Sequence, residues 1–292
     1  MKQKPLIKTL AGLVLVPVLL VLFVAGCQNA LIFHPDKHPI GLWDTGNIPL
    51  PIEDVGFEAE DGTPLHGWWV PREGAMATVL FFHGNGGNLS QRLENVFLLY
   101  HLNLNIFIFD YRGYGKSEGD PDEEGVRLDS QAAYDWLIQM RNISPESLIL
   151  FGRSLGGVFA AYTASKNEVA GLILESTFTN AQEMADELFT VLPVGWFLSA
   201  ELDTRSYVSH LNRPKLFIHG TADGMIPYTM GRKLYIGAPE PKEFYSIVGG
   251  RHNNSFRIGG RPYFDKIREF IARAVKAQNP RVPQTHTDIQ EE

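Results

Sequence analysis

Short apolar runs alternate with helical stretches along most of this chain, and this alternation constrains the fold more than any other feature. Each run is almost free of polar residues, and most are followed by a loop and a helical pattern. They are residues 79–82, 106–109, 148–151, 172–174, 216–218 and 244–248. Uniformly apolar strands joined by helices are typical of a parallel sheet covered by helices on both faces. The sequence therefore predicts an α/β fold with a mostly parallel central sheet, preceded by two further strands at 55–60 and 65–70.

The composition narrows the possible partners. Hydrophobic residues make up 44% of the 292 residues, which is enough for a sizeable buried core. The 26 basic and 33 acidic side chains give a formal net charge of −7, which argues against the backbone of a nucleic acid as a partner. We therefore expect no nucleic-acid partner.

The single cysteine, Cys27, can form neither an internal disulfide bond nor a multi-thiolate metal site.

The first 27 residues predict an attachment to a membrane. Lysines at positions 2, 4 and 8 precede an apolar stretch that ends in Val24-Ala25-Gly26-Cys27. An apolar residue, two small residues and a cysteine resemble the bacterial lipobox, where cleavage leaves a lipid-modified N-terminal cysteine. This favours a signal peptide at 1–27, with Cys27 lipidated and the rest of the chain extracytoplasmic. The alternative is an uncleaved, single-pass signal anchor. The length of the apolar stretch does not decide between a cleaved signal peptide and such an anchor.

The remainder divides into a linker, one domain and a tail. Four prolines punctuate residues 34–52, so we expect 28–52 to be an extended linker or surface strap. Residues 53–277 should form the α/β domain, with an apolar insertion at about 176–213 as a small helical cap. Residues 278–292 are polar and aperiodic, and we expect them to be a disordered tail.

A nucleophile motif follows the third of the apolar runs. Gly152-Arg153-Ser154-Leu155-Gly156 fits the pattern G-x-S-x-G and opens a helix rich in small residues. Such a sharp turn strains the serine backbone, requires glycine on both sides, and lifts the hydroxyl above the sheet at the positive end of the helix. Ligands of parallel sheets bind at the carboxyl ends of the strands, where this motif lies. We therefore predict Ser154 as a catalytic nucleophile.

A serine at such an elbow needs an acid and a base, which follow it in the chain order Ser, Asp or Glu, His. The predicted base is His252, after the last strand, because His286 lies in the polar tail. The preferred acid is Asp223, which follows the strand before that of the histidine. Glu175, at the end of an earlier strand, is the runner-up. We expect His219 to be structural.

Two backbone N–H groups should stabilise the anion that forms on the substrate. One belongs to Leu155, the residue after the nucleophile. The other lies in the loop His83-Gly84-Asn85-Gly86-Gly87-Asn88, where Asn85 is the first choice and His83 braces the loop. Glycines let this backbone approach the anion without obstruction. The loop lacks the Lys-Ser/Thr pair of a phosphate-binding P-loop.

Two weaker patterns remain. Gly115-Lys116-Ser117 resembles the end of a P-loop, but the glycine required at position 110 is Asp110. His34, Asp36 and His38 share the proline-rich strap, and a metal site there has little support.

Taken together, the strand-end motifs resemble those of the α/β-hydrolase superfamily over about residues 50–277. They occur in the family's order: His83 to Asn88, Asp110 to Ser117, Gly152 to Gly157, His219 to Asp223, and Gly250-Arg251-His252. The likeness is greatest to membrane-anchored α/β-hydrolase-domain proteins, including acyl-protein thioesterases and bacterial homologues, which carry a strap like Phe33-His34-Pro35 after a hydrophobic anchor. The resemblance implies a triad of Ser154, Asp223 and His252, and a structural role for the loop 111–119 behind the active site. Arg251 departs from the small residue that the family often has there.

These features predict a serine hydrolase that cleaves carboxylic esters or thioesters through an acyl-enzyme. Its substrate would be a small or acylated molecule, and no metal or other cofactor is needed. The apolar cap suits an acyl chain, although packing of the cap onto the domain explains it equally well. The alternatives are a serine peptidase or amidase with the same triad, and a non-catalytic surface lipoprotein.

Overall fold

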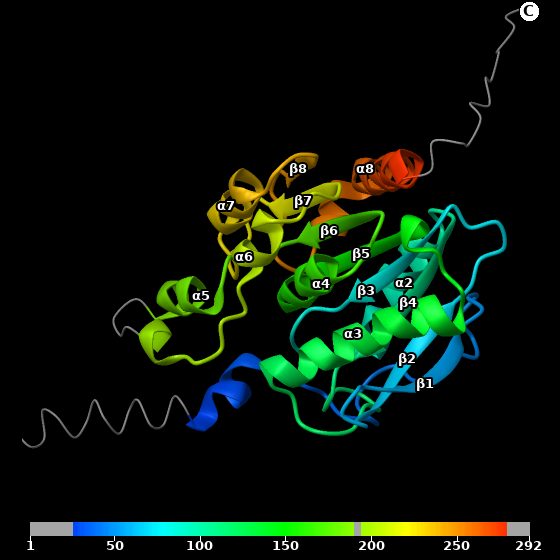
Figure 1. Ribbon diagram of the computed structural model, residues 1–292, viewed down its shortest axis with the longest axis horizontal. Coiled ribbons are helices and arrows are strands. Elements are labelled where there is room, and N and C mark those ends of the chain that lie inside the picture. Colours follow the sequence, from blue (N-terminus) through cyan, green and yellow to red (C-terminus); the bar gives the residue numbers. More distant parts are fainter. Residues whose placement is uncertain (1–25, 190–193, 279–292) are drawn as a thin grey trace, which may run out of the picture.

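The computed structural model describes residues 26–189 and 194–278, and an eight-stranded sheet forms its centre (Figure 1). The strand order is β1-β2-β4-β3-β5-β6-β7-β8. Strand β2 pairs antiparallel with β1 and β4, whereas every pairing from β4 to β8 is parallel. The bounds are β1 Glu53–Glu58, β2 Pro64–Val70, β3 Ala77–Phe82, β4 Leu104–Asp110, β5 Leu148–Arg153, β6 Gly171–Glu175, β7 Lys215–Gly220 and β8 Lys242–Ile247. The predicted mostly parallel α/β sheet is confirmed.

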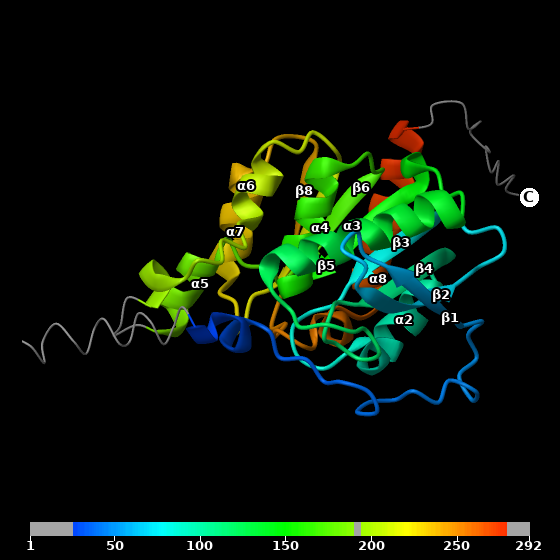
Figure 2. The same cartoon turned by 60° about the horizontal axis from the view of Figure 1, so that its bottom comes forward.

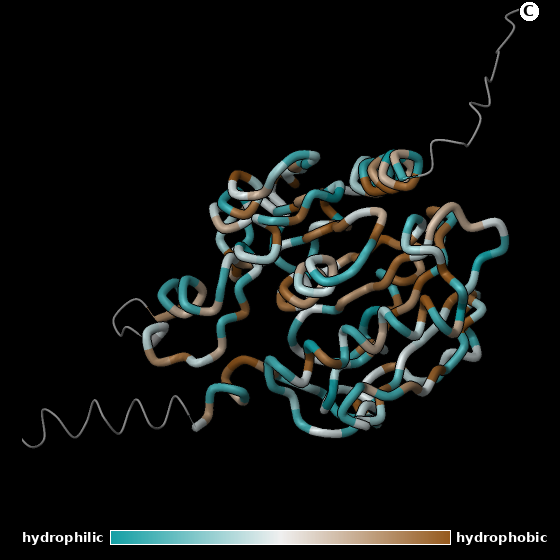
Figure 3. Tube along the Cα trace, viewed as in Figure 1, coloured by the Kyte–Doolittle hydropathy of each residue, from teal (hydrophilic) through white to brown (hydrophobic). Residues whose placement is uncertain are grey.

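Helices cover both faces of this sheet. On one face lie α3 (Glu123–Met140), α4 (Leu155–Lys166) and α7 (Tyr228–Gly237), and on the other lie α2 (Leu93–Tyr100) and α8 (Ser255–Gln278). Alternate residues of one strand point to opposite faces. Accordingly, Leu80 and Phe82 of β3 pack with α3 and α4, whereas Val79 and Phe81 pack with α2 and α8. The central strands are the most continuously hydrophobic parts of the trace (Figure 3), which explains why the sequence reveals them.

The cap lies between β6 and β7, where the sequence predicts it. It contains α5 (Ala181–Leu188), the short 3₁₀ helix η3 (Val194–Phe197) and α6 (Thr204–Ser209). In Figures 1 and 2 helix α5 stands apart from the sheet and lies beside the first described residues of the chain. The side chain of Gln28 bonds there to the backbone and hydroxyl of Ser199. The cap and the N-terminal segment are therefore in direct contact.

The strap at 28–52 lies against the surface of the domain, and its first residues are helical rather than extended. Residues 26–32 are helical, and the chain after them is bound to the domain rather than free. Pro35 forms a parallel bridge with Gly87, and Lys37 forms one with Gly115. Phe33 is only 3% exposed and packs into the core. Figure 2 shows the strap running along one edge of the molecule toward β1. The prolines prevent regular sheet pairing, but isolated backbone hydrogen bonds and one buried aromatic ring suffice to hold the strap.

Two predicted segments fall outside the description. The apolar stretch at 1–25 and the tail from 279 onward lie outside the described residues, whereas Cys27 lies within the helical residues 26–32. Among the helices of residues 26–189 and 194–278, none combines the length and the apolar character needed to cross a membrane.

Candidate active site

The turn between β5 and α4 has the strained geometry that the G-x-S-x-G pattern predicts. Ser154 has φ 54° and ψ −125°, a left-handed backbone conformation that is costly for a residue with a side chain. The glycines on either side admit no larger residue. A Cβ atom on Gly152 would lie 2.5 Å from the Gly156 carbonyl oxygen, and one on Gly156 would lie 2.2 Å from that of Phe82. The strand, the turn and the helix thus present the Ser154 hydroxyl at the sheet edge.

Ser154, His252 and Asp223 come from separate loops and form one hydrogen-bonded series. His252 Nε2 lies 3.1 Å from Ser154 Oγ, and His252 Nδ1 lies 2.9 Å from Asp223 Oδ2. All three residues are at most 9% exposed. The order hydroxyl, imidazole, carboxylate is the arrangement in which a histidine can take a proton from serine while the carboxylate fixes its orientation.

The loop after β7 holds Asp223 in its ionised form. Its Oδ1 accepts hydrogen bonds from the backbone N–H groups of Met225 (2.9 Å) and Ile226 (3.0 Å). Burial by itself would raise the pKa of Asp223, but the hydrogen bond and charge of His252, together with these N–H groups, lower the pKa below its ordinary value. His219, four residues earlier, bonds to the Ile226 carbonyl oxygen at 2.9 Å and supports the loop, as expected of a structural residue.

Glu175, the runner-up for the acid, lies in a different network. It is 1% exposed, accepts a hydrogen bond from the Tyr263 hydroxyl at 2.7 Å, and lies 3.9 Å from Arg153 Nε. Arg153 in turn donates to the backbone carbonyl of His252 at 2.6 Å. Glu175 therefore supports the loop that carries the histidine, through Arg153, and does not contact the imidazole. The sequence analysis does not identify Arg153 as a functional residue. The available indication was a charged residue inside the G-x-S-x-G turn, directly after an apolar strand.

The side chain of Asn85 ties the loop after β3 to the strap. Its Oδ1 accepts from the Tyr114 hydroxyl (2.8 Å) and from the backbone N–H groups of His34 and Gly86 (2.9 Å each), while Nδ2 bonds to the Ile32 carbonyl and to His34 Nδ1. The backbone N–H of Asn85 makes no hydrogen bond within the described chain. The sequence predicts a role for this N–H, but it does not predict the structural role of the side chain.

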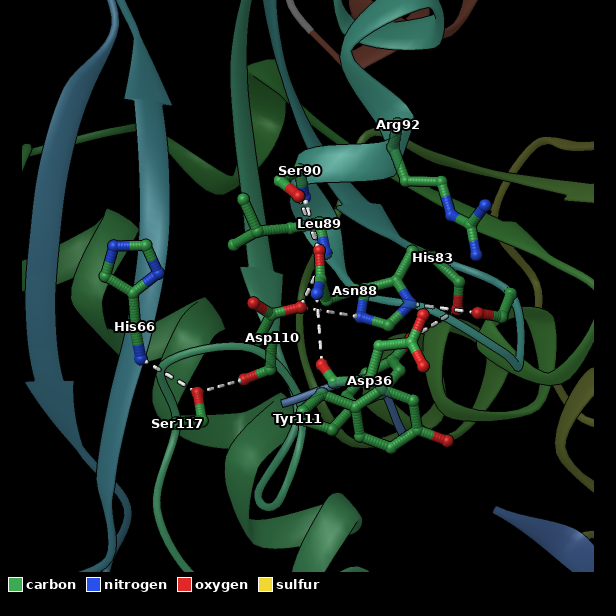
Figure 4. A network of polar contacts seen from close by, with 12 residues as sticks. Asp36, His66, His83, Asn88, Leu89, Ser90, Arg92, Asp110, Tyr111 and Ser117 are labelled. Atoms are coloured by element: carbon green, nitrogen blue, oxygen red, sulfur yellow. Dashed lines mark hydrogen bonds and ion pairs between the residues drawn. The ribbon is translucent and has the colours of Figure 1, made fainter. Parts of the chain in front are cut away.

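The loop is also supported from behind (Figure 4). His83 is fully buried, bonds through Nδ1 to the Gly84 carbonyl at 2.9 Å, and lies 3.3 Å from Asp110 Oδ1. Asp110 also accepts from the Leu89 N–H at 2.7 Å, and the Tyr111 hydroxyl donates to the His83 carbonyl at 2.8 Å. His83 and the segment that follows β4 therefore brace the loop from behind.

A cavity of about 760 Å³ opens beside Ser154 and His252. One part of its wall is apolar and comes from the cap and from the helical residues at the start of the strap. The apolar side chains there include Leu31, Ile32, Met184, Leu188, Phe189 and Leu198. The cap therefore lines the cavity as well as packing on the domain.

His34, Asp36 and His38 of the strap do not come together as a metal site. His34 bonds to Asn85, whereas Asp36 accepts a hydrogen bond from the Gln91 amide at 3.1 Å. Across residues 26–189 and 194–278, no three His, Cys, Asp or Glu side chains lie together in a way that could hold a metal ion.

Known proteins match this chain over nearly all of its described length. A family model for the alpha/beta hydrolase fold matches residues 77–195. The protein YfhR of Salmonella typhi is 35% identical, over 94% of this chain and 97% of its own. The alpha/beta hydrolase domain-containing protein WAV2 of Arabidopsis thaliana is 33% identical, over 77% of this chain and 80% of its own. This chain is an α/β hydrolase. The esterase Pf2001 of Pyrococcus furiosus has the same fold as this α/β hydrolase, with a TM-score of 0.68, 21% identity, and coverage of 83% of this chain and 97% of its own.

Proposed function

We propose that this α/β hydrolase is a serine esterase that cleaves carboxylic esters or thioesters. The observation that carries the proposal is the continuous hydrogen-bonded series from Asp223 to His252 to Ser154, at 2.9 and 3.1 Å, beside a cavity with an apolar wall. The strained turn at Ser154 adds support, because backbone strain of this kind is concentrated at functional sites. The family to which the chain belongs and the fold shared with a solved esterase also support a hydrolase.

The proposed reaction gives each group a role in acyl transfer. As Ser154 Oγ attacks the substrate carbonyl, its proton passes to His252 Nε2, and Asp223 stabilises the imidazolium through Nδ1. The backbone N–H groups of Leu155 and Asn85 stabilise the negative charge that develops on the carbonyl oxygen. His252 then returns the proton to the leaving alcohol or thiol. Water repeats the sequence on the acyl-enzyme and releases the acid.

The preference for esters over amides rests on the wall of the cavity. The apolar side chains of the cap and of residues 31–32 fit an acyl chain. A peptidase would need polar groups that bind an extended peptide backbone, and the apolar side chains of the cap and of residues 31–32 do not supply them. A non-catalytic role would give no reason for three loops to bring Ser154, His252 and Asp223 together.

Two measurements test the proposal. A fluorophosphonate probe should label the wild-type protein and leave Ser154→Ala unlabelled. A panel of acyl esters, acyl thioesters and peptide amides of matched chain length should show turnover of the esters or thioesters. Absence of labelling, or turnover confined to the amides, would replace the proposed activity.

We also propose that the domain is held at a membrane through Cys27, as a lipoprotein outside the cytoplasm. The lipobox-like sequence supports this, and so does the mouth of the cavity. There Leu31, Leu188 and Phe189 are 48%, 60% and 45% exposed, an apolar surface next to the N-terminal segment. Mass spectrometry of the mature protein should find residues 1–26 absent and a diacylglycerol on Cys27. An intact Met1 in the membrane fraction would instead establish the signal anchor.

A further inference from the structure

The wall of the cavity also carries a cation that the mechanism does not use. Arg92 ends the 3₁₀ helix η1 (Leu89–Arg92) and directly precedes α2. It lines the cavity together with Ser154 and His252. Helices α5 and α2 lie well apart in both Figures 1 and 2. The cap helix and this arginine therefore contribute to different parts of the wall of one cavity.

Arg92 differs from the other two arginines of the cavity in its lack of a carboxylate. Arg257 bonds through Nε and Nη2 to Glu94, and Arg153 lies 3.9 Å from Glu175. No Asp or Glu of the described chain lies within 4.0 Å of the Arg92 guanidinium. Its Nη2 donates to the Gly86 carbonyl, while its Nε is buried without a hydrogen-bond partner. The Nε–H of this part-buried arginine is thus left without a partner.

The surroundings increase the cost of this unpaired charge. Burial lowers the pKa of Arg92, and the positive charge of Arg153 lowers it further. The arginine nevertheless remains charged at neutral pH, because a guanidinium cannot be deprotonated in that range. The buried carboxylate of Asp110 offsets part of the charge from a distance, but it is already bonded to the Leu89 N–H. In Figure 4 no hydrogen bond or ion pair joins the Arg92 guanidinium to Asp110 or His83. A part-buried cation that lines a substrate cavity and has no carboxylate partner is well suited to an anion.

We propose that Arg92 binds an anionic group of the substrate whose ester bond Ser154 attacks. This inference rests on the proposed esterase function. The preferred substrates then join an apolar group, seated against the cap, to a group that carries a carboxylate or phosphate, seated at Arg92. Arg153 contributes a second positive charge at that end but is already engaged with the His252 loop.

Matched esters test this directly. The three substrates are 4-nitrophenyl butyrate, the same ester with a carboxylate on the phenyl ring, and 4-nitrophenyl hemiglutarate, whose acyl chain ends in a carboxylate. Values of kcat/KM are normalised to the rate of hydroxide hydrolysis. The wild type should prefer one of the two anionic esters by at least about tenfold, and the one preferred shows whether the anion lies on the leaving group or the acyl chain. Equal or lower values for both anionic esters would overturn the proposal.

Variants separate anion binding from support of the Gly86 loop. Arg92→Gln should reduce the preference for the anionic ester by about 10- to 100-fold, whereas Arg92→Lys should retain much of it. Arg257→Gln is the matched control, since its cation is already paired with Glu94 and exposed, and its preference should stay within about twofold of the wild type. If Arg92→Gln slows all three esters equally, the arginine only supports the loop and the proposal fails.

A binding measurement gives an answer independent of turnover. Calorimetry of the full-length Ser154→Ala protein should show 4-butylbenzoate binding at least about tenfold tighter than 4-butylbenzamide, and adding Arg92→Gln should remove the difference. Equal affinity for the two probes would overturn the anion site. Tighter benzoate binding by a protein that hydrolyses no ester would instead retain the anion site and reject the proposed function.

Discussion

Replacing Asp223 by asparagine should lower kcat by about 10⁴-fold and leave KM nearly unchanged. In the structure Oδ1 accepts two backbone N–H groups and Oδ2 faces His252 Nδ1 at 2.9 Å. An asparagine keeps its one oxygen on the N–H groups, so its NH₂ must face Nδ1. The imidazole then carries its proton on Nε2, which donates to Ser154 instead of accepting from it. A 10⁴-fold loss corresponds to about 5.4 kcal/mol of transition-state stabilisation.

Glu175→Gln is the matched control for this experiment, because it makes the same chemical change at the runner-up acid. The glutamine oxygen still accepts from Tyr263, and Arg153 still donates to the His252 carbonyl. We therefore expect a loss of kcat below about tenfold. Steady-state kinetics on a 4-nitrophenyl ester measures both variants, with thermal unfolding as a check of folding. If Glu175→Gln loses more kcat than Asp223→Asn, the orienting acid is Glu175 and the argument from the hydrogen-bond geometry is wrong.

Three further predictions concern Ser154, Tyr114 and Lys215. Ser154→Ala should lose at least about 10⁴-fold in kcat on esters while its thermal unfolding stays close to that of the wild type, and turnover near the wild-type level would refute the role of the serine. Tyr114→Phe removes the hydroxyl that donates to Asn85 Oδ1, so kcat should fall about three- to tenfold with KM little changed; a change confined to KM would contradict a role in positioning the loop. Burial lowers the pKa of Lys215 to about 8 from an ordinary value of 10.5, so the unfolded chain binds more protons between these two pH values. Relative to Lys215→Met, the unfolding free energy of the wild type should therefore rise by about 2 kcal/mol from pH 8 to pH 10, as measured by urea denaturation, and a flat difference would show that the ammonium group is not destabilised by burial.

The sequence reveals those parts of the molecule that depend on local patterns. The runs at 79–82 and 148–151 are apolar at every position or nearly so, because both faces of a central parallel strand are covered. The turn at Ser154 can be predicted because its geometry demands glycine at 152 and 156. His252 follows by elimination, since the other histidine after Asp223, His286, lies in the tail.

The features that the sequence does not reveal depend on contacts between distant residues. Asn85 bonds to His34, which is 51 residues away, and Arg153 bonds to the His252 carbonyl, which is 99 residues away. Neither side chain belongs to a motif that specifies its partner. The helical residues 26–32 were missed because the lipobox pattern directs attention to cleavage at Cys27, rather than to what the following residues contact.

The order in which the chain is synthesised has a consequence for the docked N-terminal segment. Gln28 is made early, yet its partner Ser199 is made 171 residues later. At a synthesis rate of 5–20 residues per second this takes about 10–30 s. Phe33 likewise lacks its core contact until Phe159 of α4, against which its ring packs, has been made. The first part of this domain to be made is thus among the last to reach its final place, and the substrate cavity is complete only when it does.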